Sequence, residues 1–258
     1  MNIDGKSIAN AIYSRLAAET AQRLTLGILI AGTDAVTDSF VRAKAKAAEK
    51  IEVVVIRKTI SETATTREAL DALSALADET DGVIVQLPLP GSIDVEQILD
   101  AIPPEKDVDG ISREPRVHPP VAGAIAEILL SHGIEARGKK AVVVGSGRLV
   151  GKPSAVLLAQ LGAAVTVVQR GDSLDVLKDA DIVVLGAGQP GLVKPEHLKK
   201  GVVLIDAGTS ESSGKIAGDA DAACADVASV FTPVPGGVGP VAVAMIFKNL
   251  HKLAGNSR

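Results

Sequence analysis

The sequence contains little sulfur and few aromatic rings. Among its 258 residues there is one cysteine, Cys224, and there is no tryptophan. A single cysteine excludes an internal disulfide, a cysteine-based zinc site and an iron–sulfur cluster held by this chain alone. Because such a chain suits a reducing compartment, we expect a cytoplasmic location.

The charge and hydropathy of the chain argue against nucleic acid and membrane partners. The formal net charge is −4 and aromatic residues make up 2% of the sequence, so we expect neither a phosphate-neutralising surface nor a row of stacking rings. Apolar runs such as VVVI and IVVLG are far shorter than the about 20 residues that cross a bilayer. The first residues mix charged with apolar positions, so no export signal is expected. The scattered histidines show no spacing typical of a metal site, so no metal is predicted.

Helical and strand-like patterns alternate along the chain. Amphipathic or apolar periodicity predicts helices over 5–20, 38–50, 65–79, 94–102, 121–133, 154–162 and 238–255. Buried apolar runs predict strands within 24–32, 51–60, 81–90, 139–147, 163–171, 179–188, 200–208 and 229–237. Strands that are apolar on both faces and separated by helices predict an α/β fold with parallel sheets covered on both sides. A segment rich in proline and charge, residues 100–120, predicts a crossing between two domains.

A glycine-rich turn follows the first strand of the second series. The strand KKAVVVG runs into GSGRLVG at 145–151 and then into an apolar helix. Glycines at such a place let a dinucleotide pyrophosphate approach the backbone and the N-terminus of the helix. The third glycine comes one residue later than in the GxGxxG pattern, and similar turns also occur in α/β domains that bind nothing. With its flanks, the turn predicts cofactor-binding residues, joined by one from a later glycine turn: Gly145, Ser146, Gly147, Val150, Gly151 and Gly188.

The end of the following strand indicates which dinucleotide is bound. Dinucleotide-binding domains that use NAD carry a carboxylate there for the ribose, whereas this chain has Arg170. An arginine favours the 2′-phosphate of NADP, so we predict NADP as the cofactor. Asp172, two residues later, keeps NAD as an alternative, and a solvated surface arginine is the simpler interpretation of Arg170.

Four further features are distinctive. Lys44 follows Phe40-Val41 on a predicted helix, and Gln86 interrupts the apolar string VIVQLPLP. Residues 106–110 read KDVDG, and residues 233–240 read PVPGGVGP. With these motifs in this order, the chain resembles the bifunctional methylenetetrahydrofolate dehydrogenase and methenyltetrahydrofolate cyclohydrolase family, often called FolD, over essentially its whole length.

The resemblance implies two lobes and two reactions. Residues 1–117, with the C-terminal helix 240–258 returning to them, would form a folate-binding catalytic domain, and residues 118–239 a Rossmann-like NAD(P)-binding domain. The family oxidises 5,10-methylenetetrahydrofolate to the methenyl form with NADP, and water then opens this form to 10-formyltetrahydrofolate in one-carbon metabolism. The resemblance also implies a homodimer.

The resemblance gives roles to three candidate catalytic residues. Lys44 matches the family's catalytic lysine, whose amine activates water only when it is neutral. Gln86 matches the residue that hydrogen-bonds and orients this lysine, and Asp109 matches the aspartate that recognises the pterin. Each also has a purely structural interpretation: a solvated helix lysine, a satisfied core amide and a turn-capping aspartate.

Four residues are candidates for substrate binding by the same resemblance. Phe40 would pack on the aminobenzoate ring. The loop PVPGGVGP touches substrate and cofactor in the family, so we expect Pro235, Gly236 and Gly237 to present backbone groups to a ligand. A structural turn between domains is the alternative for this loop.

The sequence departs from the family pattern near the predicted site. Phe40 stands where the family has tyrosine, so the ring is kept and the hydroxyl is lost. The segment after Gly110 is shorter than in the family, and Gln169 replaces its usual histidine. These changes leave open a member that retains only the cyclohydrolase activity, or a non-catalytic homologue that binds folate or nucleotide. A different two-lobed NADP-dependent oxidoreductase is a further alternative, against which PVPGGVGP argues.

Overall fold

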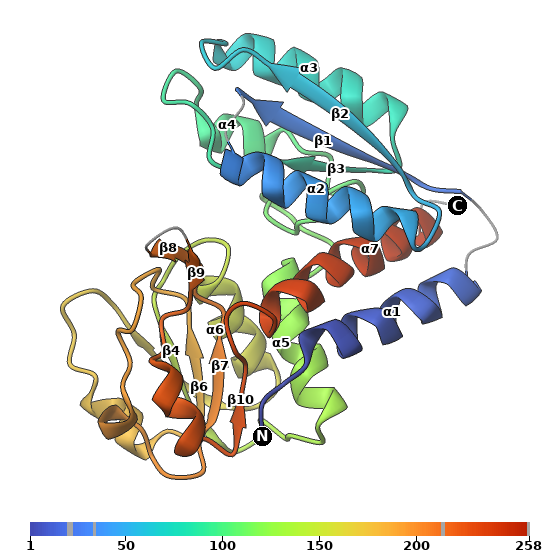
Figure 1. Ribbon diagram of the computed structural model, residues 1–258. Coiled ribbons are helices and arrows are strands. Elements are labelled where there is room, and N and C mark those ends of the chain that lie inside the picture. Colours follow the sequence, from blue (N-terminus) through green and yellow to red (C-terminus); the bar gives the residue numbers. More distant parts are fainter. Residues whose placement is uncertain (20–22, 33–34, 213–214, 257–258) are drawn as a thin grey trace. The chain divides into compact units, whose positions relative to one another are not determined.

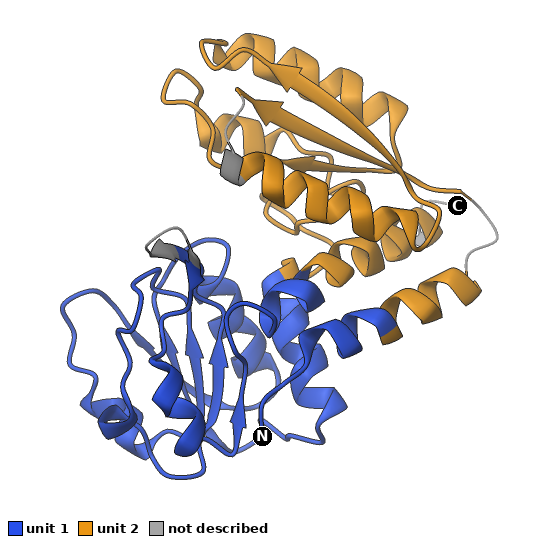
Figure 2. Cartoon of the chain, viewed as in Figure 1, with its two compact units in different colours: residues 1–10, 121–242 blue, residues 11–120, 243–258 orange. Residues whose placement is uncertain are grey.

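The computed structural model describes residues 1–19, 23–32, 35–212 and 215–256, and the chain divides into two compact units (Figures 1 and 2). Unit 1 comprises residues 1–10 and 121–242, and unit 2 comprises residues 11–120 and 243–258. Helices α1 (Gly5–Glu19) and α7 (Val238–Asn256) contain several residues of each unit, and α5 (Pro120–Ser131) begins at the last residue of the first segment of unit 2. Thr20 and residues 257–258, at the ends of predicted segments, lie outside the described residues.

Unit 2 is built on a three-stranded parallel sheet in the order β2-β1-β3. Its strands are β1 (Thr25–Ala31), β2 (Val54–Ile60) and β3 (Gly82–Val85), and its helices are α2 (Ala35–Glu49), α3 (Thr66–Glu79) and α4 (Val95–Asp100). The chain moves from β1 outward to β2 and then back past β1 to β3, so right-handed connections place α2 and α3 on opposite faces of the sheet (Figure 1).

Unit 1 contains a five-stranded parallel sheet in the order β10-β7-β6-β4-β5. The strands are β4 (Lys140–Val144), β5 (Ala164–Val168), β6 (Ile182–Leu185), β7 (Val203–Asp206) and β10 (Val230–Phe231). The α-helices of this unit are α5 (Pro120–Ser131) and α6 (Gly151–Gln160), and the 3-10 helices are η1 (Asp175–Asp179), η2 (Pro195–His197) and η3 (Ala222–Asp226). A small antiparallel pair, β8 (Ser210–Ser212) with β9 (Lys215–Ala217), follows β7.

The predicted parallel α/β architecture is confirmed, and two of the edge strands, β2 and β5, are less buried than the other strands of the parallel sheets. In β1, the central strand of unit 2, Leu26 and Ile28 are completely buried. The edge strand β2 exposes Arg57 and Lys58, and the edge strand β5 exposes most of its residues. β2 and β5 are therefore less covered than the predicted sheets imply, whereas the edge strands β3 and β10 are buried, so a place at the edge does not by itself decide coverage.

The strand order in unit 1 fixes where a ligand can bind. β5 and β6 flank β4 on opposite sides. The chain therefore runs from β4 to β5 on one side and then crosses back to β6 on the other side of β4. In open α/β sheets, ligands bind outside the carboxyl ends of the strands at this kind of switch point. The predicted glycine turn at 145–151 directly follows β4, and the loop at 186–189 follows β6.

The first residues of the chain extend the same sheet, which the sequence analysis did not predict. The Ile3 N–H donates to the Phe231 carbonyl at 2.8 Å, and the Phe231 N–H donates to the Met1 carbonyl at 2.9 Å. Residues 1–3 therefore run along β10, and residues 1–10 belong to unit 1. This grouping differs from the predicted domain limits, which placed residues 1–117 together.

Candidate active site

Lys44 and Gln86 are joined by a direct hydrogen bond. The Lys44 Nζ donates to the Gln86 Oε1 at 2.7 Å, although the two residues lie on α2 and just beyond β3. Gln86 is held on both sides, because its backbone N–H donates to the Leu29 carbonyl at 2.9 Å and its Nε2 donates to the Leu87 carbonyl at 3.0 Å. These bonds turn the amide oxygen toward the lysine. The structure thus brings together two of the three predicted catalytic residues by a direct hydrogen bond.

Asp109 reaches the same end of β3 because residues 106–109 run alongside this strand. The Val83 N–H donates to the Lys106 carbonyl at 2.7 Å, and Val83 forms a parallel bridge with Asp107. Two residues further along, Asp109 is level with the carboxyl end of β3, which Gln86 follows. Gly82 makes this close approach feasible, because a Cβ there would lie 2.6 Å from the Val108 side chain.

Burial and mutual charge set the protonation of Lys44 and Asp109. Lys44 is 9% exposed, and loss of solvent lowers the pKa of its amine, while the negative charge of Asp109 partly raises it again. Desolvation raises the pKa of Asp109 to about 6, although the Lys44 charge lowers it and the Asp107 charge raises it further. A larger fraction of the Lys44 amine is therefore neutral at a given pH than for a solvated lysine. The interpretation of Lys44 as a solvated helix residue is wrong.

The loop that carries Asp109 depends on residues that the sequence analysis did not identify. The Asn249 Nδ2 on α7 donates to the carbonyls of Val108 and His118, each at 2.9 Å. Asp107 is fully buried and accepts the Ser112 N–H at 2.8 Å. A polar residue within the apolar run VAVAMIFKNL was the available signal for Asn249.

Phe40 lies one helical turn before Lys44 on α2, and its ring is 45% exposed. Residues four apart share one side of a helix. The position leaves the ring available to a ligand in unit 2.

The glycine turn in unit 1 has the close packing that a dinucleotide site requires. Gly145 has φ +103°, and a Cβ on Gly151 would collide with the Gly145 backbone. A Cβ on Gly147 would instead meet nothing within 4 Å, so this glycine leaves open space over the backbone. The Val150 position, which precedes α6, supplies no side-chain cap to the helix N-terminus. The turn therefore fits a phosphate-bearing ligand, because Gly145 and Gly151 pack closely while Gly147 leaves space for the ligand beside the backbone.

Arg170 and Asp172 occupy the turn after β5, and their contacts differ. Arg170 is exposed. The Asp172 Oδ2 accepts the Gln169 N–H at 2.7 Å, and the Asp172 N–H donates to the Gln169 carbonyl at 3.1 Å. The Asp172 carboxylate is thus engaged in its own turn, whereas the Arg170 side chain is exposed.

The loop with Pro235, Gly236 and Gly237 lies in unit 1 and is tied to the start of α1. Gly236 has φ +109°, and its carbonyl accepts the Gly5 N–H at 3.0 Å. The Gly237 N–H donates to the Pro233 carbonyl at 2.7 Å. The loop therefore has a defined backbone shape, as the glycine and proline content predicts.

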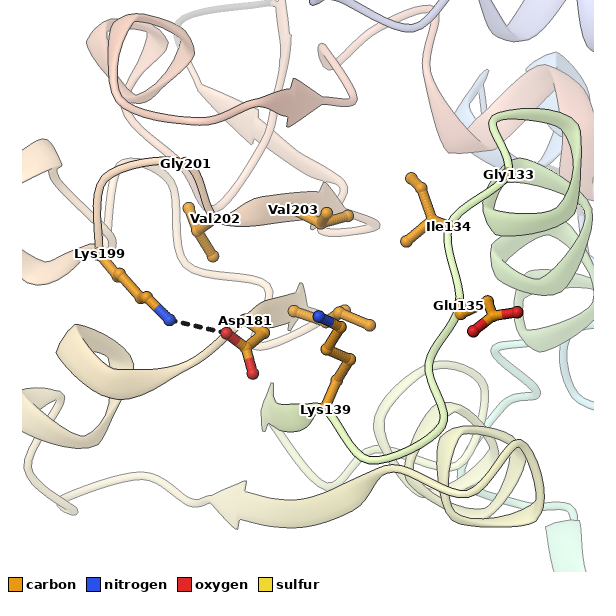
Figure 3. Close-up of a pocket in the computed structure, with 10 residues that line it drawn as sticks. Gly133, Ile134, Glu135, Lys139, Asp181, Lys199, Gly201, Val202 and Val203 are labelled. Atoms are coloured by element: carbon orange, nitrogen blue, oxygen red, sulfur yellow. Dashed lines mark hydrogen bonds and ion pairs between the residues drawn. The ribbon is translucent and has the colours of Figure 1, made fainter.

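A cavity of about 480 Å³ lies elsewhere in unit 1 (Figure 3). Its lining includes Lys139, Asp181 and Val202, which lie at the amino ends of β4, β6 and β7. The Lys199 Nζ is bound to the Asp181 Oδ1 at 2.7 Å within it. The glycine turn follows the carboxyl end of β4, so this cavity lies at the opposite edge of the sheet from the glycine turn.

Other chemistries receive no support from the part of the chain that the structure describes. Burial raises the pKa of Cys224 to about 11, so its thiol is protonated at neutral pH. No group of three histidine, cysteine or acidic side chains that could hold a metal ion occurs among the described residues. Within those same residues, no helix has the length and apolar character needed to cross a membrane.

Two family models match consecutive parts of the chain. Residues 3–109 match the catalytic domain of tetrahydrofolate dehydrogenase/cyclohydrolase, and residues 119–258 match the NAD(P)-binding domain of the same family. A curated Staphylococcus aureus (strain Newman) protein named bifunctional protein FolD is 39% identical over 268 aligned positions, covering 96% of this chain and 94% of the relative.

Solved structures agree with these matches. The bifunctional FolD enzyme from Campylobacter jejuni superposes with a TM-score of 0.95 at 30% identity, over 100% of this chain and 99% of that chain. The Trypanosoma brucei enzyme, solved with NADP cofactor and inhibitor, gives a TM-score of 0.92 at 36% identity, over 100% of this chain and 98% of that chain. With the Lys44–Gln86 contact beside β3 and the glycine turn after β4, these matches show that the chain belongs to the tetrahydrofolate dehydrogenase/cyclohydrolase family.

Proposed function

We propose that this chain oxidises 5,10-methylenetetrahydrofolate to the methenyl form with NADP and hydrolyses the methenyl form to 10-formyltetrahydrofolate. The observation that carries the proposal is the 2.7 Å bond from a buried lysine amine to Gln86, in a region that matches the family's catalytic domain. The glycine turn, in a region that matches the family's NAD(P)-binding domain, supports the redox half. No observation favours a member limited to one activity or a non-catalytic homologue.

In the hydrolytic step, Lys44 acts on the attacking water. Its Nζ takes a proton from the water as the oxygen bonds to the methenyl carbon and the C=N π electrons move onto nitrogen, and burial favours the neutral amine that this requires. The bond from this carbon to N5 then breaks as N5 takes a proton from the lysine ammonium, and the hydroxyl proton is released as the formyl C=O forms on N10. The Gln86 Oε1 accepts one N–H of the same amine and so fixes the direction of its lone pair. Asp109, once ionised, accepts two N–H groups from the amidine-like edge of the pterin.

In unit 1, the glycine turn and Arg170 would hold NADP. Gly145, Ser146, Gly147, Val150 and Gly151 would surround the pyrophosphate at the start of α6, with Gly188 on the loop after β6. Arg170 would bind the 2′-phosphate. When bound, NADP accepts the hydride that leaves the methylene carbon of the folate. Phe40, Pro235, Gly236 and Gly237 complete the proposed set as contacts to the substrate.

We also propose a homodimer that forms through the β5 edge. β5 is the last strand of its sheet and carries Val167, which is 39% exposed. Val156 and Leu161 on and after α6, which contacts β5, are exposed as well. An apolar edge strand with unpaired backbone groups is suited to pairing with a second copy. The cytoplasm is the proposed location, in keeping with a single buried, free cysteine.

Two absorbance assays test the proposed function. The purified protein is mixed with 5,10-methylenetetrahydrofolate and either NADP or NAD, and the reduced nicotinamide is followed. Separately, the loss of added methenyltetrahydrofolate is followed without nucleotide. We expect both reactions, with NADP preferred over NAD. Methenyl loss alone would identify a cyclohydrolase, and a folded protein without either reaction would overturn the enzymatic proposal.

A further inference from the structure

The loop at 186–189 lies beside the glycine turn at the switch point. β4 and β6 are paired up to Val144 and Leu185, so the turns that follow them are neighbours. A Cβ on Gly145 would lie 2.5 Å from the Gly186 carbonyl oxygen, and a Cβ on Gly186 would collide with the Val150 side chain. Because ligands of such sheets occupy the space between these two turns, the shape of the 186–189 loop affects dinucleotide binding directly.

One buried carboxylate fixes this loop through three consecutive backbone groups. Asp219 is completely buried. Its Oδ2 accepts the N–H groups of Ala187 at 2.6 Å and Gly188 at 3.0 Å, and its Oδ1 accepts that of Gln189 at 2.7 Å. The same loop includes a left-handed residue, since Gly188 has φ +68°. The loop is therefore held in one conformation by protein groups alone.

A second buried carboxylate, at the end of β7, fixes the backbone that carries Asp219. The Asp206 Oδ1 accepts the N–H groups of Gly208 at 2.9 Å and Asp219 at 3.2 Å. The Asp206 Oδ2 accepts the Ala220 N–H at 2.8 Å. A chain of contacts thus leads from β7 through Asp206 and Asp219 to the loop after β6.

Two glycines make room for these carboxylates. A Cβ on Gly208 would collide with the Asp219 carboxylate, and a Cβ on Gly218 would collide with the Asp206 carboxylate. Desolvation raises the pKa of Asp206 to about 6, although the hydrogen bonds from the backbone of Ala220, Asp219 and Gly208 lower it. Perturbed carboxylates of this kind are typical of functional sites, where a defined geometry matters more than stability.

We propose that Asp219 is a positioning residue for NADP binding, which holds the Ala187–Gln189 backbone in the conformation that receives the dinucleotide. The inference rests on the proposed function, because it takes NADP as the ligand that binds between the turns after β4 and β6. Asp219 acts through the loop, and Asp206 fixes the backbone of Asp219 and Ala220 by accepting their N–H groups. An asparagine cannot replace it, because its NH₂ group would face one of the three N–H donors.

The substitution Asp219→Asn tests this role, with Asp226→Asn as the matched control on the exposed end of η3. The steady-state KM for NADP and the kcat at saturating NADP are measured after circular dichroism has shown that each variant is folded. Loss of a charge-assisted hydrogen bond predicts a KM raised by about tenfold or more, with kcat changed by less than about twofold. Asp226→Asn should match the wild type. An unchanged KM in folded Asp219→Asn, even with a lowered Tm, would overturn the positioning role.

Hydrogen exchange on the wild-type protein gives a second test that does not depend on a variant folding. Without NADP, the amides of Ala187, Gly188 and Gln189 should exchange as slowly as those of β6. Free exchange of these amides until NADP is added would contradict the proposal. Failure of the wild type to bind NADP would overturn the proposed function instead, so the two failures are distinguishable.

Discussion

The chemistry of Lys44 depends on its immediate neighbours. A lysine in water is almost fully protonated at neutral pH and cannot act as a base. Here, burial lowers the pKa of the amine, Gln86 holds it from one side, and Asp109 limits the shift through its charge. Lys46, two residues further along α2, is exposed and lacks this environment. Lys44 and Lys46 therefore differ in burial and in their neighbouring side chains, although both lie on α2.

Asp109 predicts how methenyl hydrolysis depends on pH. Its pKa is raised to about 6, and only the ionised carboxylate accepts both N–H groups of the pterin. The kcat/KM for methenyltetrahydrofolate should therefore fall as pH decreases through about 6, and the neutral fraction of Lys44 should increase the rate as pH rises further. The kcat/KM for methenyltetrahydrofolate, measured at intervals of about half a pH unit between about pH 5 and 8, gives this profile. The ionisation near pH 6 should be missing in Asp109→Asn, and a wild-type profile that is flat across this range would refute the assignment.

At the scale of helices and strands, the repeated pattern of apolar runs was sufficient to predict the order of the α-helices and of the parallel strands, but not the β8–β9 pair or the 3-10 helices. The pairing of Lys44 with Gln86 was also predictable, because each stands out in its sequence context and matches a family motif. The contacts of Asp206 and Asp219 with backbone N–H groups were not predictable. The contacts of Asp219 join residues 30 to 32 positions apart and those of Asp206 residues 2 to 14 positions apart, all through N–H groups that every residue except proline possesses, so no side-chain pattern predicts them. The pairing of residues 1–3 with β10 was not predicted either, because it too is formed by backbone groups.

Asn249 illustrates an element-level role that stability measurements can test. Its Nδ2 holds the carbonyls of Val108 and His118, and the side chain is 5% exposed. Asn249→Leu should lower the free energy of unfolding by about 2–4 kcal/mol, since it leaves two carbonyls without their donor. Urea unfolding measures the loss, with the exposed Lys252→Ala on the same helix as control. A loss below about 0.5 kcal/mol would mean that these bonds do not support the loop before Asp109.

At the scale of the whole molecule, the chain distributes its functional groups over two units. The lysine, glutamine and aspartate of the folate chemistry lie in unit 2, and the glycine turn with its supporting carboxylates lies in unit 1. The two matched family domains follow the same order along the chain. Unit 2 therefore carries the residues proposed to act on the folate, and unit 1 carries those proposed to hold the nucleotide.

The proposed homodimer makes a prediction at this scale. The wild type should sediment as a dimer, and Val167→Lys should shift it toward the monomer because a charge would be buried at the β5 edge. Sedimentation velocity at several concentrations measures the change. Leu130→Lys, at the most exposed large apolar residue, is the control and should remain dimeric. A wild type that sediments as a monomer, or a Val167→Lys variant that stays dimeric, would refute the β5 interface.

The most direct test of the account compares two lysines of α2 in one assay. Lys44→Ala and Lys46→Ala are each mixed with methenyltetrahydrofolate, and the loss of the methenyl absorbance is followed at pH 7 to 8. Removing a general base should lower kcat by about 10²-fold or more in Lys44→Ala, whereas Lys46→Ala should match the wild type. Folded Lys44→Ala with hydrolysis near the wild-type rate would show that the buried amine beside Gln86 is not the catalytic group.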